Sequence, residues 1–337
     1  MSVAFARPEY TARGAGHSGR SRLALISLAI CLQTVVGVPA AIAQHFGEWG
    51  SPVSLDPDRA IGINTAVNDG CPIESPDGRT LYLATDRRGN QLDIWTVARA
   101  IDDAWAIEPL PSPVNTTAAE FCPTPLPGNQ LLFVSTRANN CGPTGAAPNA
   151  DIYHTRRDHK GNWLEPQPLG CTVNSGGAEF SPSLVQTEGQ TMLFFSSDRG
   201  TPGQHRIYVS VQEPDGTWRA AEAIHELNAG VGSDARPNVR KDGLEIVWDS
   251  TRSNSLPQIY TASRASVFEP WSGVTPLESC PLACVNDPTA AQSRPSFSRD
   301  GTRLYFGSTR ANATLGGVQG DIYFSSRPGP GKGRQAR

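Results

Sequence analysis

The sequence lacks several features that would place it in a common class of enzyme. It has no amphipathic helical pattern of useful length between its apolar runs, which argues against a helical or α/β fold. It has no G-x-S-x-G motif, so a serine hydrolase of the nucleophile-elbow type is unsupported. It also has no paired C-x-x-C motif, which weakens the case for a zinc site and leaves any metal unknown.

A basic surface is missing as well. The 29 Lys and Arg residues are outnumbered by 32 Asp and Glu residues, which gives a net charge of −3. The first 43 residues carry four arginines and one glutamate, so the rest of the chain has a net charge of −6. An acidic chain without a basic stripe argues against nucleic acid as a partner.

Residues 1–43 have the pattern of a signal peptide. Four arginines precede an uncharged segment, residues 23–43, which ends in the small-x-small sequence Ala41-Ile42-Ala43. Gln33 and Thr34 interrupt the apolar part, which is too short for a transmembrane span. We therefore expect export to the periplasm or the extracellular space, with a buried helix or lipidation at Cys31 as alternatives.

One sequence unit occurs five times in the remaining chain. Each copy runs from a proline through a tight turn, often Asp-Gly, to an apolar run, a Ser/Thr/Asp-Arg step and an Ile-Tyr or Ile-Trp pair. The copies are 51, 59, 55 and 58 residues apart and begin at Pro72, Pro123, Pro182, Pro237 and Pro295. A fixed period of this length indicates an array of one supersecondary unit.

Each unit contains the pattern of four short strands. The proline segment, the apolar run and the Ile-aromatic segment supply three, and a fourth is expected to begin at Trp105, Trp163, Trp218 and Trp271. The sequence therefore predicts an all-β fold, a five-bladed β-propeller of four-stranded antiparallel blades spanning residues 44–327, with a flexible tail at 328–337.

The two ends of the array are complementary. Trp49 opens an extra fourth strand before the first unit, and the last unit ends after its third strand at Ser325. Pairing these two strands would close the ring and remove two free sheet edges.

These motifs also support a family resemblance. With Ser-Pro-Asp-Gly at residues 75–78, the Ser/Thr-x-Arg steps and the Asp-Ile-Tyr segments, the chain resembles the PD40, or WD40-like (TolB-type), repeat family of bacterial envelope propellers. The resemblance covers roughly residues 46–327 and implies a propeller fold at the cell envelope. Five units depart from the six blades usual in TolB-type propellers, and a fold does not by itself imply an activity.

A ring of polar side chains is the first candidate site. Three residues before the repeated prolines stand Asp69, Glu120, Glu179, Asp234 and Gln292, preceded upstream by Asn64, Asn115, Asn174, Asn228 and Asn286. At the start of every innermost strand, the ring could hold a cation, a sugar hydroxyl or a basic group of a peptide. The alternative, which we favour, is that each acid binds backbone amides at a blade junction.

Arginines recur with equal regularity at the end of each second strand: Arg87, Arg137, Arg199, Arg252 and Arg310. Asp93, Asp151 and Asp321 precede three of the Ile-aromatic pairs, so Arg–Asp pairs between adjoining strands are expected. Arg206 and Gln258 break this rule in the third and fourth units. Arg199, Arg206 and Arg252 are therefore candidates for binding an anionic group on the top face.

Six cysteines follow the leader, and an even number in an exported chain favours disulfides. We expect three pairs: Cys280 with Cys284 in one loop, Cys141 with Cys171 in loops on the same face, and Cys71 with Cys122 at equivalent positions near the axis.

The sequence thus predicts an exported, monomeric propeller that binds an envelope protein or a carbohydrate. No cofactor is expected, although a cation in the central channel is possible. The alternative is a glycan-processing enzyme that uses the acidic ring, but five near-equivalent residues do not show the division of labour that glycoside hydrolysis needs.

Overall fold

The computed structural model describes residues 46–89, 91–99, 105–139, 141–142, 149–187, 189–228, 230–280, 283–311 and 320–331. The chain divides into two units, residues 1–40 and 41–337, and the first lies outside the described residues, as does the rest of the predicted leader. Every regular element in the described part of the second unit is a strand, and no helix there is long and apolar enough to cross a membrane.

The strands form five separate four-stranded antiparallel sheets, as the repeat predicts. The first two blades contain β2 (Asp69–Glu74), β3 (Thr80–Thr85), β4 (Asp93–Arg99) and β5 (Trp105–Pro109), then β6 (Glu120–Leu126), β7 (Gln130–Ser135), β8 (Asp151–Arg156) and β9 (Gln167–Pro168). The third contains β10 (Glu179–Thr187), β11 (Gln190–Ser197), β12 (Arg206–Val211) and β13 (Glu222–Ala223). The fourth contains β14 (Asp234–Val239), β15 (Glu245–Ser250), β16 (Gln258–Ser263) and β17 (Ser272–Pro276).

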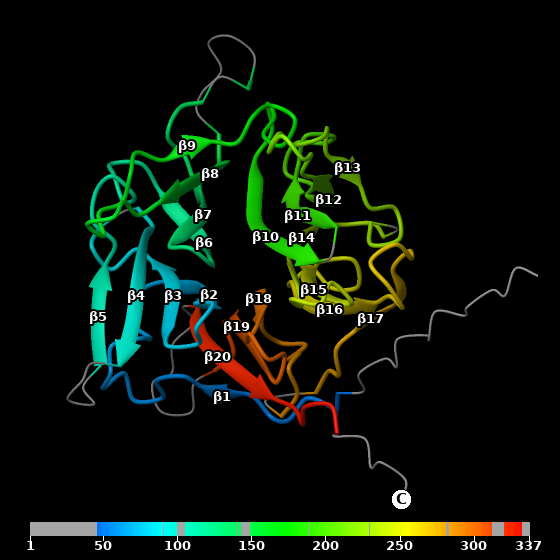
Figure 1. Ribbon diagram of the computed structural model, residues 1–337. Coiled ribbons are helices and arrows are strands. Elements are labelled where there is room, and N and C mark those ends of the chain that lie inside the picture. The colour runs from blue at the N-terminus through cyan, green and yellow to red at the C-terminus, as the bar shows by residue number, and fades with distance from the viewer. Residues whose placement is uncertain are drawn as a thin grey trace, which may run out of the picture. The chain divides into compact units, whose positions relative to one another are not determined.

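The fifth blade combines both ends of the array. It consists of β18 (Gln292–Phe297), β19 (Arg303–Ser308), β20 (Asp321–Ser326) and β1 (Val53–Ser54). β1 pairs antiparallel with β20, with Val53 opposite Phe324 and Ser54 opposite Tyr323. The predicted closure is therefore confirmed, and Figure 1 shows β1 and β20 side by side.

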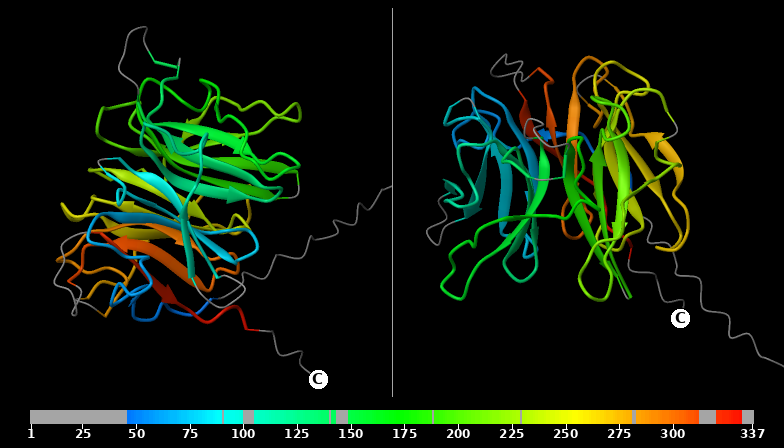
Figure 2. Two further views of the ribbon diagram at one scale, coloured as in Figure 1. Left: turned by 90° about the vertical axis from the view of Figure 1, so that its left-hand side faces the viewer. Right: turned by 90° about the horizontal axis from the view of Figure 1, so that it is seen from above.

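The blades surround a central axis. The first strand of each blade lies nearest the centre, namely β2, β6, β10, β14 and β18 (Figure 1). Side views show the connecting loops at the two ends of the blades (Figure 2). We call one end the top face: it holds the loops between second and third strands and the loops that lead into each first strand.

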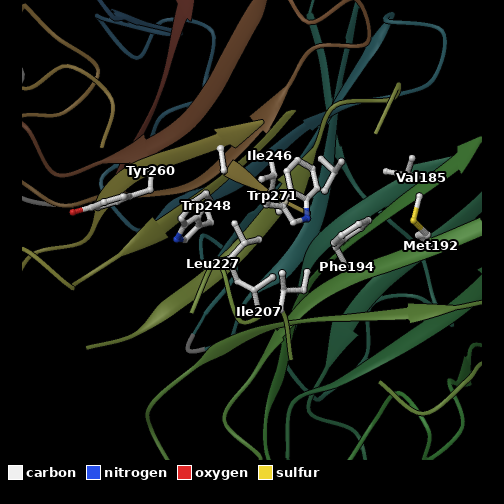
Figure 3. Packing of buried hydrophobic residues seen from close by; sticks show 12 residues of the cluster. Val185, Met192, Phe194, Ile207, Leu227, Ile246, Trp248, Tyr260 and Trp271 are labelled. Atoms are coloured by element: carbon white, nitrogen blue, oxygen red, sulfur yellow. The ribbon is translucent and has the colours of Figure 1, made fainter. Parts of the chain in front are cut away.

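Apolar side chains pack between neighbouring blades. In the largest cluster, Phe194 of the third blade meets Trp271 of the fourth, with ring centroids 6.2 Å apart (Figure 3). Trp248, whose side chain is completely buried, belongs to the same cluster. Burying large aromatic side chains of this kind typically contributes about 1.5–3 kcal/mol each.

The tryptophans mark the fourth strands less directly than expected. β5 begins at Trp105, but β9 and β13 begin four residues after Trp163 and Trp218, which make only isolated bridges to the third-strand extension. β1 likewise begins four residues after Trp49. Trp163 is buried and holds Arg157 4.7 Å above its ring, so it anchors the outer edge of its blade rather than opening a strand.

A backbone feature of the first strands sets up the channel. Every first strand shifts register, and the residue just before its proline has a positive φ, between 45° and 55°: Cys71, Cys122, Ser181, Arg236 and Arg294. A bulge re-aims the side chain at its position. These five residues all line the central channel.

All three predicted disulfides are confirmed. Cα–Cα distances are 4.9 Å for Cys71–Cys122 and 5.2 Å for both Cys141–Cys171 and Cys280–Cys284. The first bridge joins the innermost strands of two neighbouring blades.

Candidate functional site

The predicted ring residues lie at the top ends of the first strands, but they are buried between the blades. None of the five is more than 1% exposed, and none lines the central channel. Glu120 represents them: its carboxylate accepts hydrogen bonds from Thr116 N, Ser135 Oγ and Arg137 Nη2 at 2.8, 2.8 and 3.1 Å. This arrangement uses the ring residue to hold its own blade together, and the predicted ligand role of the ring stays a prediction.

Four of the repeated arginines form ion pairs with the acidic ring residues and not with the aspartates of the third strands. Arg87 Nη2 lies 2.8 Å from Asp69 Oδ1, and the corresponding pairs are Arg137–Glu120, Arg199–Glu179 and Arg252–Asp234. The expected pairs with Asp93 and its equivalents do not form at these arginines, because each guanidinium turns toward the loop that leads into its blade. Arg137, for example, donates to the carbonyl of Val114 in that loop.

Each arginine also covers the aromatic ring of the third strand. The Arg199 guanidinium carbon lies 4.7 Å from the centre of the Tyr208 ring, and Arg137 lies 5.2 Å from that of Tyr153. Arg206, the exception in the third unit, lies 3.6 Å from Asp234 and so joins Arg252 at the same carboxylate. A role of Arg199, Arg206 and Arg252 in binding an anion remains a prediction.

The repeated asparagines form a second set of joints. Asn174 Oδ1 accepts a hydrogen bond from Ile152 N, and its Nδ2 donates to Ile152 O, at 2.9 and 3.1 Å. Equivalent bonds join Asn64, Asn115, Asn228 and Asn286 to the third strand of the preceding blade. Each amide therefore ties a top loop to its neighbouring blade.

The side chains next to the channel-lining positions Cys122 and Ser181 are unlike these regular joints. Phe121 and Phe180 meet edge to face, with centroids 5.6 Å apart, and His205 stacks on Phe180 at 4.5 Å. All three side chains are partly exposed. Burial lowers the pKa of His205, and the nearby Arg236 lowers it further, whereas the charges of Asp198 and Asp249 act in the opposite direction.

Charged groups follow on the first strands of the fourth and fifth blades. Arg236 forms a bidentate pair with Asp249, in which Nε and Nη2 lie 2.8 and 2.6 Å from the carboxylate oxygens. Arg294 follows at the equivalent position of the fifth blade, and its backbone N–H donates to Asp249 at 2.9 Å. The sequence pattern did not predict a role for these three residues. The signal was the residue before each proline, which changes from Cys and Ser to Arg in the last two units.

Several buried polar atoms have no hydrogen-bond partner in the described part of the chain. They are Asp151 Oδ1, His205 Nδ1, Asp234 Oδ2, Gln292 Oε1 and Arg294 Nε. Native interiors satisfy most such atoms, so each exception indicates a bound water or a ligand at its own position, and of the five residues Arg294 lines the channel. We define the channel mouth as Phe121, Phe180, His205, Arg236 and Arg294, together with Asp249. No group of three metal-ligating side chains occurs in the described ranges.

No protein-family model matches the sequence, and no curated protein matches it either, so the PD40 resemblance remains a resemblance. Solved structures resemble the fold. An α-L-arabinofuranosidase from Podospora anserina has a TM-score of 0.51 and 13% identity over 85% of this chain and 98% of that one. A GH43 endo-arabinanase from Bacillus licheniformis has a TM-score of 0.50 and 13% identity over 78% and 94%.

TolB from Acinetobacter baumannii is also similar, with a TM-score of 0.44 and 15% identity over 77% of this chain and 54% of that one. The two structures with TM-scores of 0.51 and 0.50 relate the folds alone and leave activity open, because one propeller fold serves many functions.

Proposed function

We propose that this chain is an exported binding module of the cell envelope, which holds a protein or carbohydrate ligand at the channel mouth. Export is supported by the leader pattern and by three disulfides, which persist in oxidising compartments. The propeller supplies a rigid frame, and the top loops supply the surface.

One observation carries the proposal: the blade joints repeat, whereas the channel mouth does not. Asparagine joints occur at all five blade junctions, and four of the five ring residues are acids paired with arginine. At the channel mouth, by contrast, aromatic side chains of two blades pack together, and His205 Nδ1 and Arg294 Nε have no hydrogen-bond partner among the described residues. Positions that depart from a repeat needed for folding are the best candidates for function.

The binding role can be tested with the double variant Phe180→Ala/His205→Ala. Binding of a panel of envelope oligosaccharides and purified envelope proteins would be measured by biolayer interferometry. We expect the double variant to lose at least tenfold in affinity for whichever ligand the wild type binds. Phe268→Ala is the control, since Phe268 is 73% exposed in a loop at the opposite end of the blades. Equal binding by all three proteins would contradict the proposal.

A glycan-processing enzyme is the second candidate, because Asp151 and Glu179 lie close together and burial, with the Glu179 charge, raises the pKa of Asp151 to about 7. Glycoside hydrolysis uses two carboxyl groups, one of which is held protonated by a raised pKa. Both side chains are at most 1% exposed, however, so substrate does not reach them in this conformation. Release of reducing sugar by the wild type, abolished in Glu179→Gln, would favour the enzyme.

A further inference from the structure

The channel narrows to a small cavity at the level of the repeated prolines. Its volume is about 30 Å³, and its lining includes Ser181, Arg236 and Arg294 on one side and the Cys71–Cys122 disulfide on the other. A space of this size holds about two water-sized groups.

The charges in this cavity do not balance. Both oxygens of Asp249 are occupied by the bidentate pair with Arg236, and one of them also accepts the backbone N–H of Arg294. The Arg294 guanidinium has no hydrogen-bond acceptor among the described residues, and its Nε is buried. Two guanidinium groups and one carboxylate leave one positive charge without a partner.

The Arg294 guanidinium lies against the neighbouring blade. A Cβ atom on Gly70 would lie 2.7 Å from Arg294 Nη1, so any larger residue there would require the guanidinium to move. The equivalent positions in the other blades are Phe121, Phe180, Ala235 and Ser293. Burial, and then the positive charge of Arg236, lower the pKa of Arg294 to about 10. The guanidinium therefore remains charged at pH 7.

We propose that the channel binds a compact monoanion, either a halide or a single carboxylate group, at Arg294 beside Arg236. A partly buried guanidinium whose Nε is shielded from solvent and has no counter-charge is costly, and a single negative charge would neutralise it. The cavity volume limits the anion to a halide or the end of a carboxylate. The cations that line the cavity disfavour a metal ion at this level of the channel.

The direct test is a crystal of the wild-type protein soaked in bromide. We expect an anomalous peak within hydrogen-bonding distance of the Arg294 guanidinium, about 3–3.5 Å from its nitrogens. Bromide sites confined to the outer surface would overturn the proposal. This measurement does not depend on how any variant folds.

Thermal melting at constant ionic strength gives the affinity and the kind of anion. Chloride and formate should each raise the melting temperature of the wild type with a saturable dependence, while sulfate, which is larger and divalent, should not. Saturation by formate alone would identify a carboxylate of a larger ligand, and saturation by chloride would identify a free ion.

Arg294→Met removes the charge and keeps most of the apolar stem. We expect its apparent affinity for the anion to fall at least tenfold. Arg88→Met is the control, because Arg88 lies on the top face and its side chain is 55% exposed. The same saturable effect in Arg294→Met as in wild type would contradict the proposal.

Discussion

Glu120 illustrates how one buried charge is accommodated at a blade junction. Its side chain is completely buried, but three kinds of donor reach it: a backbone N–H, hydroxyl groups and the Arg137 guanidinium. Burying a carboxylate is tolerable only with such a set of partners. Glu165 lies 4.0 Å from the same guanidinium, but 72% of its side chain is exposed.

Replacing Glu120 by Gln should therefore destabilise the protein, because Arg137 would remain buried without its negative partner. We expect the free energy of unfolding to fall by about 2–4 kcal/mol. Glu165→Gln, the matched control at the same arginine, should change it by less than about 0.5 kcal/mol. Urea denaturation measures both. An unchanged stability in Glu120→Gln, with loss of ligand binding, would instead support a ligand role for the ring.

Asp151 predicts a dependence of stability on pH. Burial, and then the neighbouring Glu179, raise the pKa of Asp151 to about 7 in the folded protein, above its ordinary value of 3.8. The folded state therefore binds the proton more tightly than the unfolded state, and the stabilising contribution of the neutral form is lost as pH rises through 7.

Asp151→Asn should remove this contribution, since the amide stays neutral. We expect the fall in melting temperature between pH 5 and pH 8 to be smaller in Asp151→Asn than in wild type. Glu226→Gln, an exposed change on the top face, should leave the wild-type slope unaltered. A slope equally steep in Asp151→Asn would assign the pH dependence to another group.

The partners of single side chains were the part least accessible from sequence. The repeat correctly located each arginine and each acid, but it did not show that Arg87 reaches back to Asp69 instead of across to Asp93. That choice depends on the direction of the side chain at the strand end and on the carbonyls of Gly62 and Ile63, which Arg87 also binds. Similarly, the positive φ before each proline has no sequence signal when the residue is cysteine or arginine.

At the scale of the element, the strands were predictable because turn residues and apolar alternation punctuate each unit. The two inner pairings of each unit, first strand with second and second with third, follow directly from chain order. The shortness of the fourth strands was not predicted: β9 and β13 contain two residues each.

Asn174 is a direct test of the asparagine joints. Its amide is completely buried and makes three hydrogen bonds, two to Ile152 and one to Leu169 O. Asn174→Ala would leave the buried N–H of Ile152 without an acceptor, and we expect a loss of about 2–4 kcal/mol in unfolding free energy. Asn149→Ala removes one exposed bond to Gly176 O and should cost less than about 1 kcal/mol. Equal effects of the two changes would show that the asparagine joint has no special role.

For the whole molecule, closure is the feature that the repeat count predicted best. Five units, with a surplus fourth strand at one end and a missing one at the other, allow one closed ring. The contacts extend beyond β1: Gly47 N donates to Pro328 O, and Arg327 lies 4.2 Å from the ring centre of Trp49. The first described residues therefore serve as the outer layer of the last blade.

Deleting residues 46–55 should expose the edge of β20 and cause aggregation or a large loss of stability, which size-exclusion chromatography and thermal melting would measure.

A circular permutant is the control for this deletion. The deletion could destabilise the protein simply by removing residues, whereas the permutant keeps residues 46–55 and changes only their place in the chain. The permutant joins Gly331 to Phe46 by a short loop and opens the chain after Asp56. In it β1 follows β20 in chain order, as the fourth strand follows the third in the other four blades. The contact between Gly47 and Pro328 makes this connection short. We expect the permutant to be monomeric and to melt within a few degrees of wild type, while the deletion is not. A well-folded monomeric deletion would show that β1 is dispensable and would refute closure as the source of stability.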